Sequence, residues 1–109
     1  MSVNTPRIFG QLKPTDTLNP TVLYSVPANT RAQVTLFVCN QSSDIEFFRI
    51  ALVPSGGTLI NARFIAWDSP LAGNGVFSVS GIGLNQGDSI WVKSNAGNLS
   101  FTATGIQLS

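Results

Sequence analysis

Residues 21–40 read TVLYSVPANTRAQVTLFVCN, and this stretch predicts two β-strands separated by a sharp corner. Side chains alternate across a pleated strand, so Val22, Tyr24 and Val26 are expected to share one face of the first strand. Pro27 ends that strand because proline cannot donate a backbone hydrogen bond. Beyond the turn, two sets of residues alternate with the period of a strand: Ala32, Val34, Leu36 and Val38 against Gln33, Thr35, Phe37 and Cys39.

The rest of the chain repeats this pattern of short strands and turns. Further strands are predicted at residues 45–54, 61–67, 76–80, 89–94 and 99–108, with Asn, Gly, Ser and Asp gathered between them. No segment sustains a helical period. Because Phe37 makes the second face of its strand partly apolar, a covering sheet on that side is expected as well. The sequence therefore predicts an all-β protein, an antiparallel β-sandwich of about seven to eight strands. Jelly-roll-like and immunoglobulin-like strand orders both remain open.

The length of 109 residues predicts a single domain with a core of its own. Residues 1–20 contain three prolines and no firm period, so they are expected to form an extended N-terminal arm, in which only residues 7–12 could form a short strand. The sandwich domain is then expected to span residues 21–109. The arm is either a frayed terminus or a segment that orders against a neighbouring subunit through Ile8, Phe9 and Leu12.

Charge is scarce in this chain. Charged residues make up 10% of it, against about 25% in typical domains, and the net charge is +1. This composition excludes the basic footprint of a nucleic-acid-binding protein and favours self-association, because charge repulsion between copies is weak. No signal peptide and no run long enough to span a membrane is apparent, which predicts a chain made in the cytoplasm and without a membrane partner. Cys39 is the single cysteine, which excludes an intramolecular disulfide; it is expected to be buried.

The residues needed for common catalytic centres are missing. The chain has no His, which removes Ser-His-Asp and Cys-His nucleophile systems and the commonest metal ligand. Asp44 and Glu46 lie two apart and could face a sugar, but both border a turn and are expected to be solvated. No catalytic, cofactor-binding or metal-binding residue is assigned, and the sequence predicts that the protein is not an enzyme.

Four large side chains within the apolar strands are candidates for partner binding. Arg49 and Arg63 either cover the sheet with their stems, with the guanidinium in water or on a carboxylate, or pair with a carboxylate across a subunit interface. Trp67 and Trp91 are either core of the second layer, interface anchors, or a platform on which a sugar stacks. With Ile8, Phe9 and Leu12 they complete the set of candidate binding residues.

Four segments resemble a known family. They are LYSVPANTRAQVTLFVCNQ at residues 23–41, FFRIALVPSGG at 47–57, NARFIAWDSPLAGN at 61–74 and LNQGDSIWVKSNAGNLSFTATG at 84–105. Together they resemble small structural proteins of tailed bacteriophages, including cyanophages. The resemblance covers roughly residues 23–105 and leaves out the first twenty.

This resemblance implies a virion component without catalytic residues. The leading expectation is a capsid decoration (cement) protein, located on the capsid surface of the virion and made in the host cytoplasm. Its expected partners are the major capsid protein and further copies of itself in a homotrimer. The alternatives are a structural module of the tail, baseplate or fibre, and a module that binds host glycans.

Overall fold

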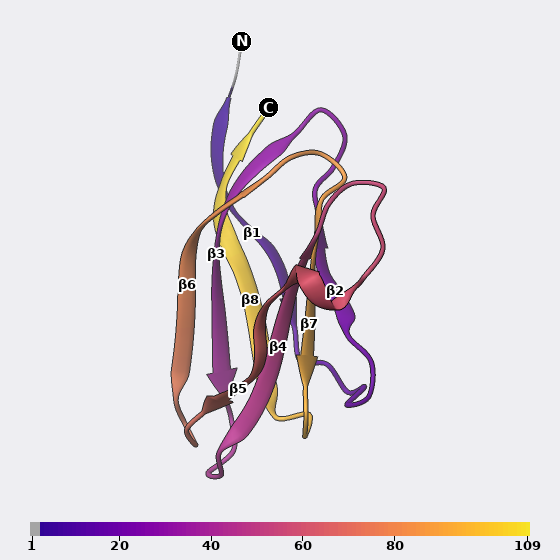
Figure 1. Ribbon diagram of the computed structural model, residues 1–109. Coiled ribbons are helices and arrows are strands. Elements are labelled where there is room, and N and C mark those ends of the chain that lie inside the picture. The colour runs from indigo at the N-terminus through magenta and orange to yellow at the C-terminus, as the bar shows by residue number, and fades with distance from the viewer. Residues whose placement is uncertain (1–2) are drawn as a thin grey trace.

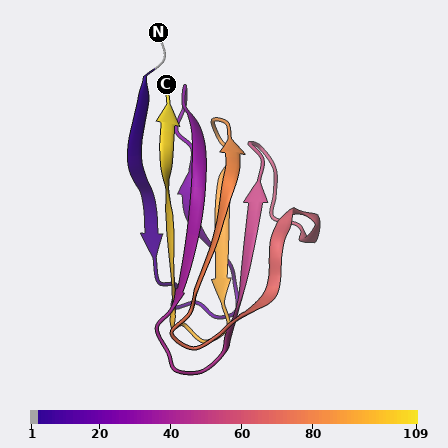
Figure 2. The ribbon, with the colours of Figure 1, turned by 90° about the vertical axis from the view of Figure 1, so that its left-hand side faces the viewer.

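The structure, a computed structural model, describes residues 3–109, which form two four-stranded antiparallel sheets packed face to face (Figure 1). In chain order the elements are β1 (Asn4–Leu12), β2 (Thr21–Ser25), β3 (Arg31–Asn40), β4 (Glu46–Val53), the short 3-10 helix η1 (Asn61–Arg63), β5 (Phe64–Leu71), β6 (Val76–Leu84), β7 (Ser89–Ser94) and β8 (Leu99–Leu108). Sheet A has the order β1-β8-β3-β6, and sheet B has the order β2-β7-β4-β5. The predicted antiparallel β-sandwich is confirmed. Figure 2 looks onto sheet A, with sheet B behind it.

The strand order resolves which kind of sandwich this is. Consecutive strands lie in opposite sheets at every connection except the one between β4 and β5. An immunoglobulin-like sandwich instead keeps several sequential hairpins within one sheet. Eight strands that alternate between two sheets in this way form a jelly roll, which is the first of the two alternatives that the sequence left open.

The core lies between the inner faces of the two sheets. Along β3 the predicted alternation is confirmed, because Val34, Leu36 and Val38 are at most 2% exposed. From the opposing sheet, Phe48 is buried on β4, and its ring lies 5.0 Å from that of Phe77 on β6. Both sheets therefore contribute apolar side chains to one continuous core.

The face predicted for the first strand of the opening stretch is wrong. Leu23 and Val26 are buried, whereas Val22 is exposed and Tyr24 is half-buried. The pairing of β2 with β7 shifts register between Val22 and Tyr24, and such an irregularity disturbs the alternation of side chains across the strand. Strict alternation from Val22 to Val26 therefore failed at this position.

The outer face of sheet A, which points away from sheet B, is exposed to solvent. Phe37 is 40% exposed there, and Cys39, which was expected to be buried, is only partly covered. Both residues lie on the face of β3 opposite to Val38, and no third layer covers this face within residues 3–109. The apolar Phe37 thus does not mark a second covered face.

The N-terminal segment takes part in the sandwich. Residues 4–12 form β1, which pairs along its length with β8 at the edge of sheet A. The predicted boundary at residue 20 therefore does not coincide with the edge of the sandwich; residues 13–20 connect β1 to β2. The first two residues of the predicted arm, Met1 and Ser2, lie outside the described residues. The strand predicted at residues 61–67 also begins later, because Asn61–Arg63 form η1.

Candidate binding surface

The outer face of sheet B carries a compact cluster of an arginine, an aspartate and a tryptophan. The Arg49 guanidinium donates two hydrogen bonds to the Asp68 carboxylate, Nε to Oδ1 at 2.7 Å and Nη2 to Oδ2 at 3.0 Å. The same guanidinium carbon lies 3.5 Å from the centre of the Trp67 ring. This bidentate pair, stacked on an indole, combines the two geometries for which arginine is best suited.

A bulge in β5 brings the three residues together. In the pairing of β4 with β5, Phe48 lies opposite Ser69 and Ile50 lies opposite Ala66. Arg49 therefore faces two residues of β5, Trp67 and Asp68, instead of one. Asp68 has a φ of 48°, a left-handed conformation that Asp tolerates better than most residues. The extra residue aims the indole and the carboxylate at the same guanidinium.

Exposed aromatic side chains extend this cluster. Phe47 is 38% exposed and Trp67 is 49% exposed. The Phe64 ring packs edge-on against Trp67, with centroids 4.9 Å apart and planes at 89°. We call Phe47, Arg49, Trp67 and Asp68 the aromatic surface. The Trp67 ring contacts an ion pair within the chain, so its position does not depend on a partner.

The ion pair also sets the charge states on this surface. The hydrogen bonds from Arg49 hold the pKa of the Asp68 carboxyl below its ordinary value of 3.8. In return, the hydrogen bond to Asp68 raises the pKa of Arg49 above its ordinary value. Both groups therefore stay charged at neutral pH, and the surface combines opposite charges with apolar rings.

Two of the candidate residues meet in this surface and a third lies nearby. Arg49 and Trp67 are in direct contact, and Arg49 pairs with a carboxylate of its own chain. Trp91 lies on the same face of sheet B, on the neighbouring strand β7, where it is opposite Ala51. It is half-buried, and its indole Nε1 donates to Ser89 Oγ at 2.9 Å. Trp67 is too exposed to be core of a second layer.

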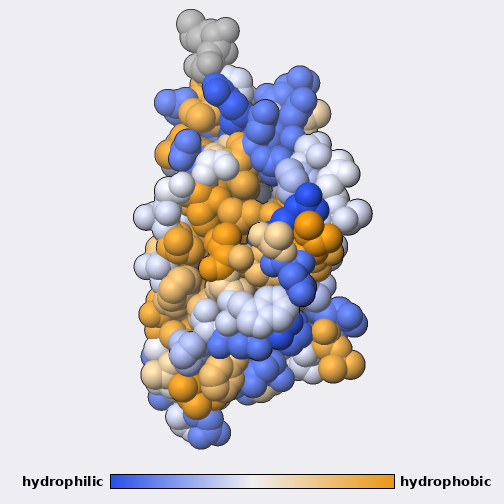
Figure 3. Space-filling model, viewed as in Figure 1, coloured by the Kyte–Doolittle hydropathy of each residue, from blue (hydrophilic) through white to orange (hydrophobic). Residues whose placement is uncertain are grey.

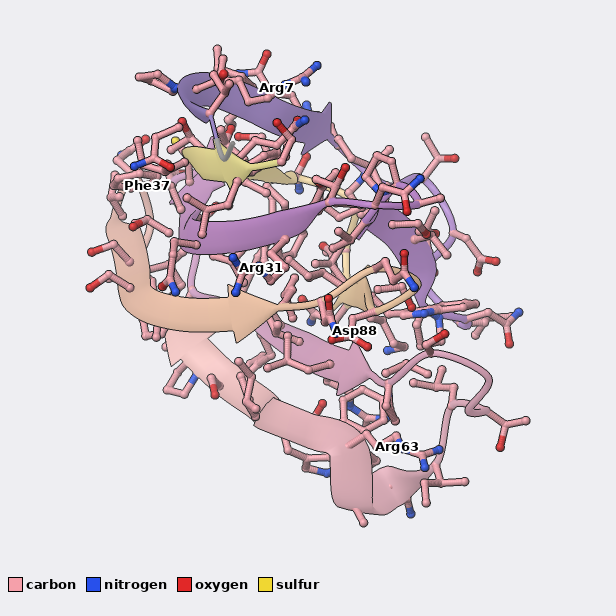
Figure 4. All side chains as sticks on the ribbon, turned by 90° about the horizontal axis from the view of Figure 1, so that it is seen from above. Arg7, Arg31, Phe37, Arg63 and Asp88 are labelled. Carbon is pink, nitrogen blue, oxygen red and sulfur yellow. The ribbon has the colours of Figure 1, made fainter. Side chains whose placement is uncertain are left out.

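The other four candidates are placed elsewhere. Arg63 belongs to η1, and its guanidinium donates to the carbonyl of Thr58 within the loop that precedes β5. Ile8, Phe9 and Leu12 lie on β1. Phe9 and Leu12 pack against the core of their own sandwich, so only Ile8, at 60% exposed, presents most of its side chain to solvent. Figure 4 shows Arg7, Arg31 and Arg63 on three different elements, without a basic cluster among them.

Phe47 and Asp68 were not among the binding residues predicted from the sequence. One signal for Asp68 was available, because the chain has only five acidic residues and this one directly follows an aromatic residue in a strand. An arginine within an apolar strand commonly pairs with a carboxylate, and Asp68 directly follows the strand that was predicted next along the chain. The bulge that joins them leaves no comparable signal in the alternation of side chains.

Glu46 differs from the solvated carboxylate that was expected. It is 4% exposed, and its Oε2 accepts a hydrogen bond of 2.7 Å from Asn98 Nδ2. Asp44 is exposed, and its backbone carbonyl accepts hydrogen bonds from the side chains of Asn40 and Ser42. Among residues 3–109, no group of three or more acidic, Cys or His side chains is arranged to hold a metal ion. No helix in this part of the chain is long and apolar enough to cross a membrane.

Comparison with known proteins found no family model that matches the chain. No curated protein sequence matches it either.

Proposed function

We propose that this protein is a bacteriophage capsid decoration protein, which binds the assembled shell from outside and stabilises it. The observation that carries the proposal is the aromatic surface. Protein interfaces are enriched in aromatic residues and Arg, and the residues that dominate binding energy are often Trp and Arg. Phe47, Arg49 and Trp67 place these residue types together on a rigid sheet. The resemblance to tailed-phage structural proteins supplies the class of partner, the major capsid protein.

The proposed mechanism is mass action on the assembled particle. A protein that binds the complete shell but not its separated subunits stabilises the shell in proportion to the occupied sites. Many copies act on one particle, so each contact can be modest. The jelly roll suits this role because its strands hold the aromatic surface in one geometry, which keeps the entropic cost of binding low.

The geometry at Trp67 limits where a glycan could stack. A sugar that stacks on tryptophan needs an open ring face. One face of Trp67 is already covered by the Arg49 guanidinium, at 3.5 Å from the ring centre. The jelly roll occurs in both viral capsid domains and lectins, so the architecture does not separate the two roles. The Arg49 guanidinium leaves one face of Trp67 for a sugar, so binding experiments decide between a protein partner and a glycan.

Copy number tests the role in the particle. Quantitative mass spectrometry of purified virions should find this chain at an abundance close to that of the major capsid protein. A copy number far below that of the major capsid protein would assign the chain to the tail, baseplate or fibre. Absence from purified virions would overturn the proposal altogether.

A binding experiment tests the aromatic surface. Capsids assembled without this protein should bind the purified chain in cosedimentation, and Trp67→Ala should weaken binding by at least about tenfold. The matched control is Ile65→Ala on the same strand, since Ile65 is 50% exposed and Trp67 is 49% exposed. Equal binding by both variants would show that the aromatic surface is not the contact. Binding to host glycans that is lost on Trp67→Ala would favour the glycan-binding alternative.

A further inference from the structure

Strand β6 leaves one edge of sheet A open. It pairs with β3 on one side only, so the backbone groups on its other side are free to pair with a further strand. Its sequence, VFSVSGIGL, contains no charged residue and no proline. Proteins usually protect such edges with charges, proline or bulges. Residues 76–79 have none of these, because the bulge of this strand comes after them, between Val79 and Ile82.

The other three edge strands are protected. β1 carries Pro6 and the exposed Arg7, and a register shift interrupts it between Ile8 and Gly10. β2 has only five residues and contains its own register shift. β5 carries Pro70 and the Asp68 bulge. Within the described chain, β6 is thus the one edge strand of more than five residues that lacks both proline and charge.

The side of the sandwich at which β5 and β6 lie is also apolar. Figure 3 looks onto this side and shows hydrophobic surface in its middle. Phe77 and Val79 of β6 and Leu52 and Ala66 of sheet B are only partly buried there. At one end, a cavity of about 190 Å³ is lined by residues that include Leu52, Gly83 and Leu84. A strand added to β6 would cover part of this surface.

We propose that β6 pairs with β6 of a second copy of this chain, antiparallel and across a twofold axis. The chain is the natural occupant because the edge is complementary to itself: it carries no charge, so two copies meet without repulsion. With the axis at Ser78, Ser78 lies opposite Ser78 of the second copy, and Phe77 lies opposite Val79, within the regular part of the strand. The two sheets A then form one continuous eight-stranded sheet.

This pairing has a definite consequence for the outer face of sheet A. Phe37 lies beside Ser78 in the sheet, and its ring is on the outer side (Figure 4). The pair would therefore place two Phe37 rings on one surface, with two Ser78 residues between them. An interface of this kind is isologous and closes as a dimer, in contrast to the homotrimer that the resemblance implies. The dimer interface does not involve the aromatic surface, so the dimer proposal does not depend on the proposed capsid binding.

Sedimentation velocity of the purified chain over a range of concentrations tests the dimer. The expected mass at high concentration is twice the 11.6 kDa of the monomer. Ser78→Lys should shift the protein to the monomer, because it places two ammonium groups opposite each other. The matched control is Gln11→Lys, in the same row of sheet A but at the β1 edge, which should leave the dimer intact. A wild-type monomer at every concentration, a trimer, or a dimer unaffected by Ser78→Lys would overturn the proposal.

Disulfide trapping tests the register without a destabilising change. Directly opposed residues of antiparallel strands have Cα atoms about 4.5–5.5 Å apart, which is within the range that a disulfide spans. With Cys39→Ser as background, Ser78→Cys should form covalent dimers under mild oxidation. Gln11→Cys in the same background should remain monomeric. Equal cross-linking of both variants would mean random collision and would overturn the register.

Discussion

The two long sides of the sandwich are held in different ways. At the side formed by β1 and β2, the two sheets touch directly. The Phe9 ring stacks on Tyr24 with centroids 4.7 Å apart, which joins sheet A to sheet B. Next to it, a Cβ at Gly10 would lie 2.5 Å from the Leu23 carbonyl oxygen, so only glycine fits between the strands. This side is closed by packing.

The side formed by β5 and β6 is held instead by a buried polar residue at one end. Asn40 is 1% exposed, and its Nδ2 donates to the carbonyls of Asp44, Leu71 and Ala72 at 2.8, 3.0 and 3.3 Å. Its Oδ1 accepts from the backbone and hydroxyl of Ser42. These bonds fix the turn between β5 and β6 but leave the length of β6 uncovered. The comparison shows that a sandwich can order an edge strand without closing its edge, which leaves that edge available for pairing.

The largest expected effect is on the polar anchor. Asn40→Ala removes the hydrogen bonds to three carbonyl groups in a buried place, and we expect it to lower the free energy of unfolding by about 3–4 kcal/mol. Urea unfolding measures the loss. Hydrogen exchange should accelerate at Asn74 and Gly75, whose amides are bonded in this turn, before it does at β1. Ser43→Ala, which changes an exposed side chain in the turn that follows Asn40, is the control; a loss for Asn40→Ala no greater than for this control would contradict the role of Asn40.

The next largest loss of stability is expected at the side formed by β1 and β2. Gly10→Ala forces β1 away from β2, because the added methyl group meets backbone and not a flexible side chain. We expect a loss of about 2 kcal/mol in urea unfolding, in the usual range for an overpacked site. Gly83→Ala is the matched control on β6, since a Cβ there has only the end of the Gln33 side chain near it, at 3.7 Å. Similar losses for the two variants would remove the difference between the sides.

A smaller effect on stability is expected from the ionisation of Tyr24, the single tyrosine. Burial raises the pKa of the Tyr24 hydroxyl above its ordinary value of 10.0. Because the unfolded chain ionises first, the stabilising contribution is complete below pH 10 and is lost as the pH rises through the folded pKa. Tyrosinate absorbance, which reports Tyr24 alone, should therefore titrate above 10.0 in the folded protein. Tyr24→Phe should lose less stability than the wild type above pH 10; a titration at or below 10.0 would mean that the closed side admits water.

The sequence predicted the elements whose signals are local. The alternation of Val34, Leu36 and Val38 identified β3, because a central strand with one core face repeats every two residues. The jelly-roll order was not predictable, since it depends on pairings between strands distant in the chain, such as β1 with β8. For the same reason β1 was predicted as an arm with at most a short strand at residues 7–12: its proline is compatible with an edge strand, and only the partner strand reveals the edge.

The candidate site was predicted in part for a related reason. Arg49 and Trp67 stood out as a charge and a large ring within apolar strands, and the structure brings them together. Their common partner Asp68 was missed because it reaches Arg49 through a bulge. Bulges also explain the wrong face of β2, at Val22 and Tyr24. Alternation describes regular strands, whereas this chain places its distinctive contacts at irregular positions.

The smallest expected effect is a difference in pKa behaviour between two acidic residues, one on each side of the sandwich. Asp16, between β1 and β2, has its pKa lowered mainly by hydrogen bonds from the backbone amides of Asn19 and Leu18. Asp68, on β5, has its pKa lowered by the Arg49 side chain. Both carboxylates stabilise the folded state above their ordinary pKa of 3.8, and this contribution is lost as the pH falls through the lower folded values. Carboxyl NMR titrations can follow each group separately.

Salt should distinguish the two causes. Mobile ions screen an exposed ion pair far more than a short hydrogen bond to a backbone amide, and the Debye length is only about 3 Å at 1 M salt. We therefore expect the pKa of Asp68 to rise toward 3.8 in high salt, while that of Asp16 changes less. Arg49→Ala should reproduce the salt effect on Asp68 and leave Asp16 unchanged. Equal salt responses of the two carboxyls would show that the Arg49 pair does not persist in solution, and the aromatic surface would then lose the contact that holds its tryptophan in place.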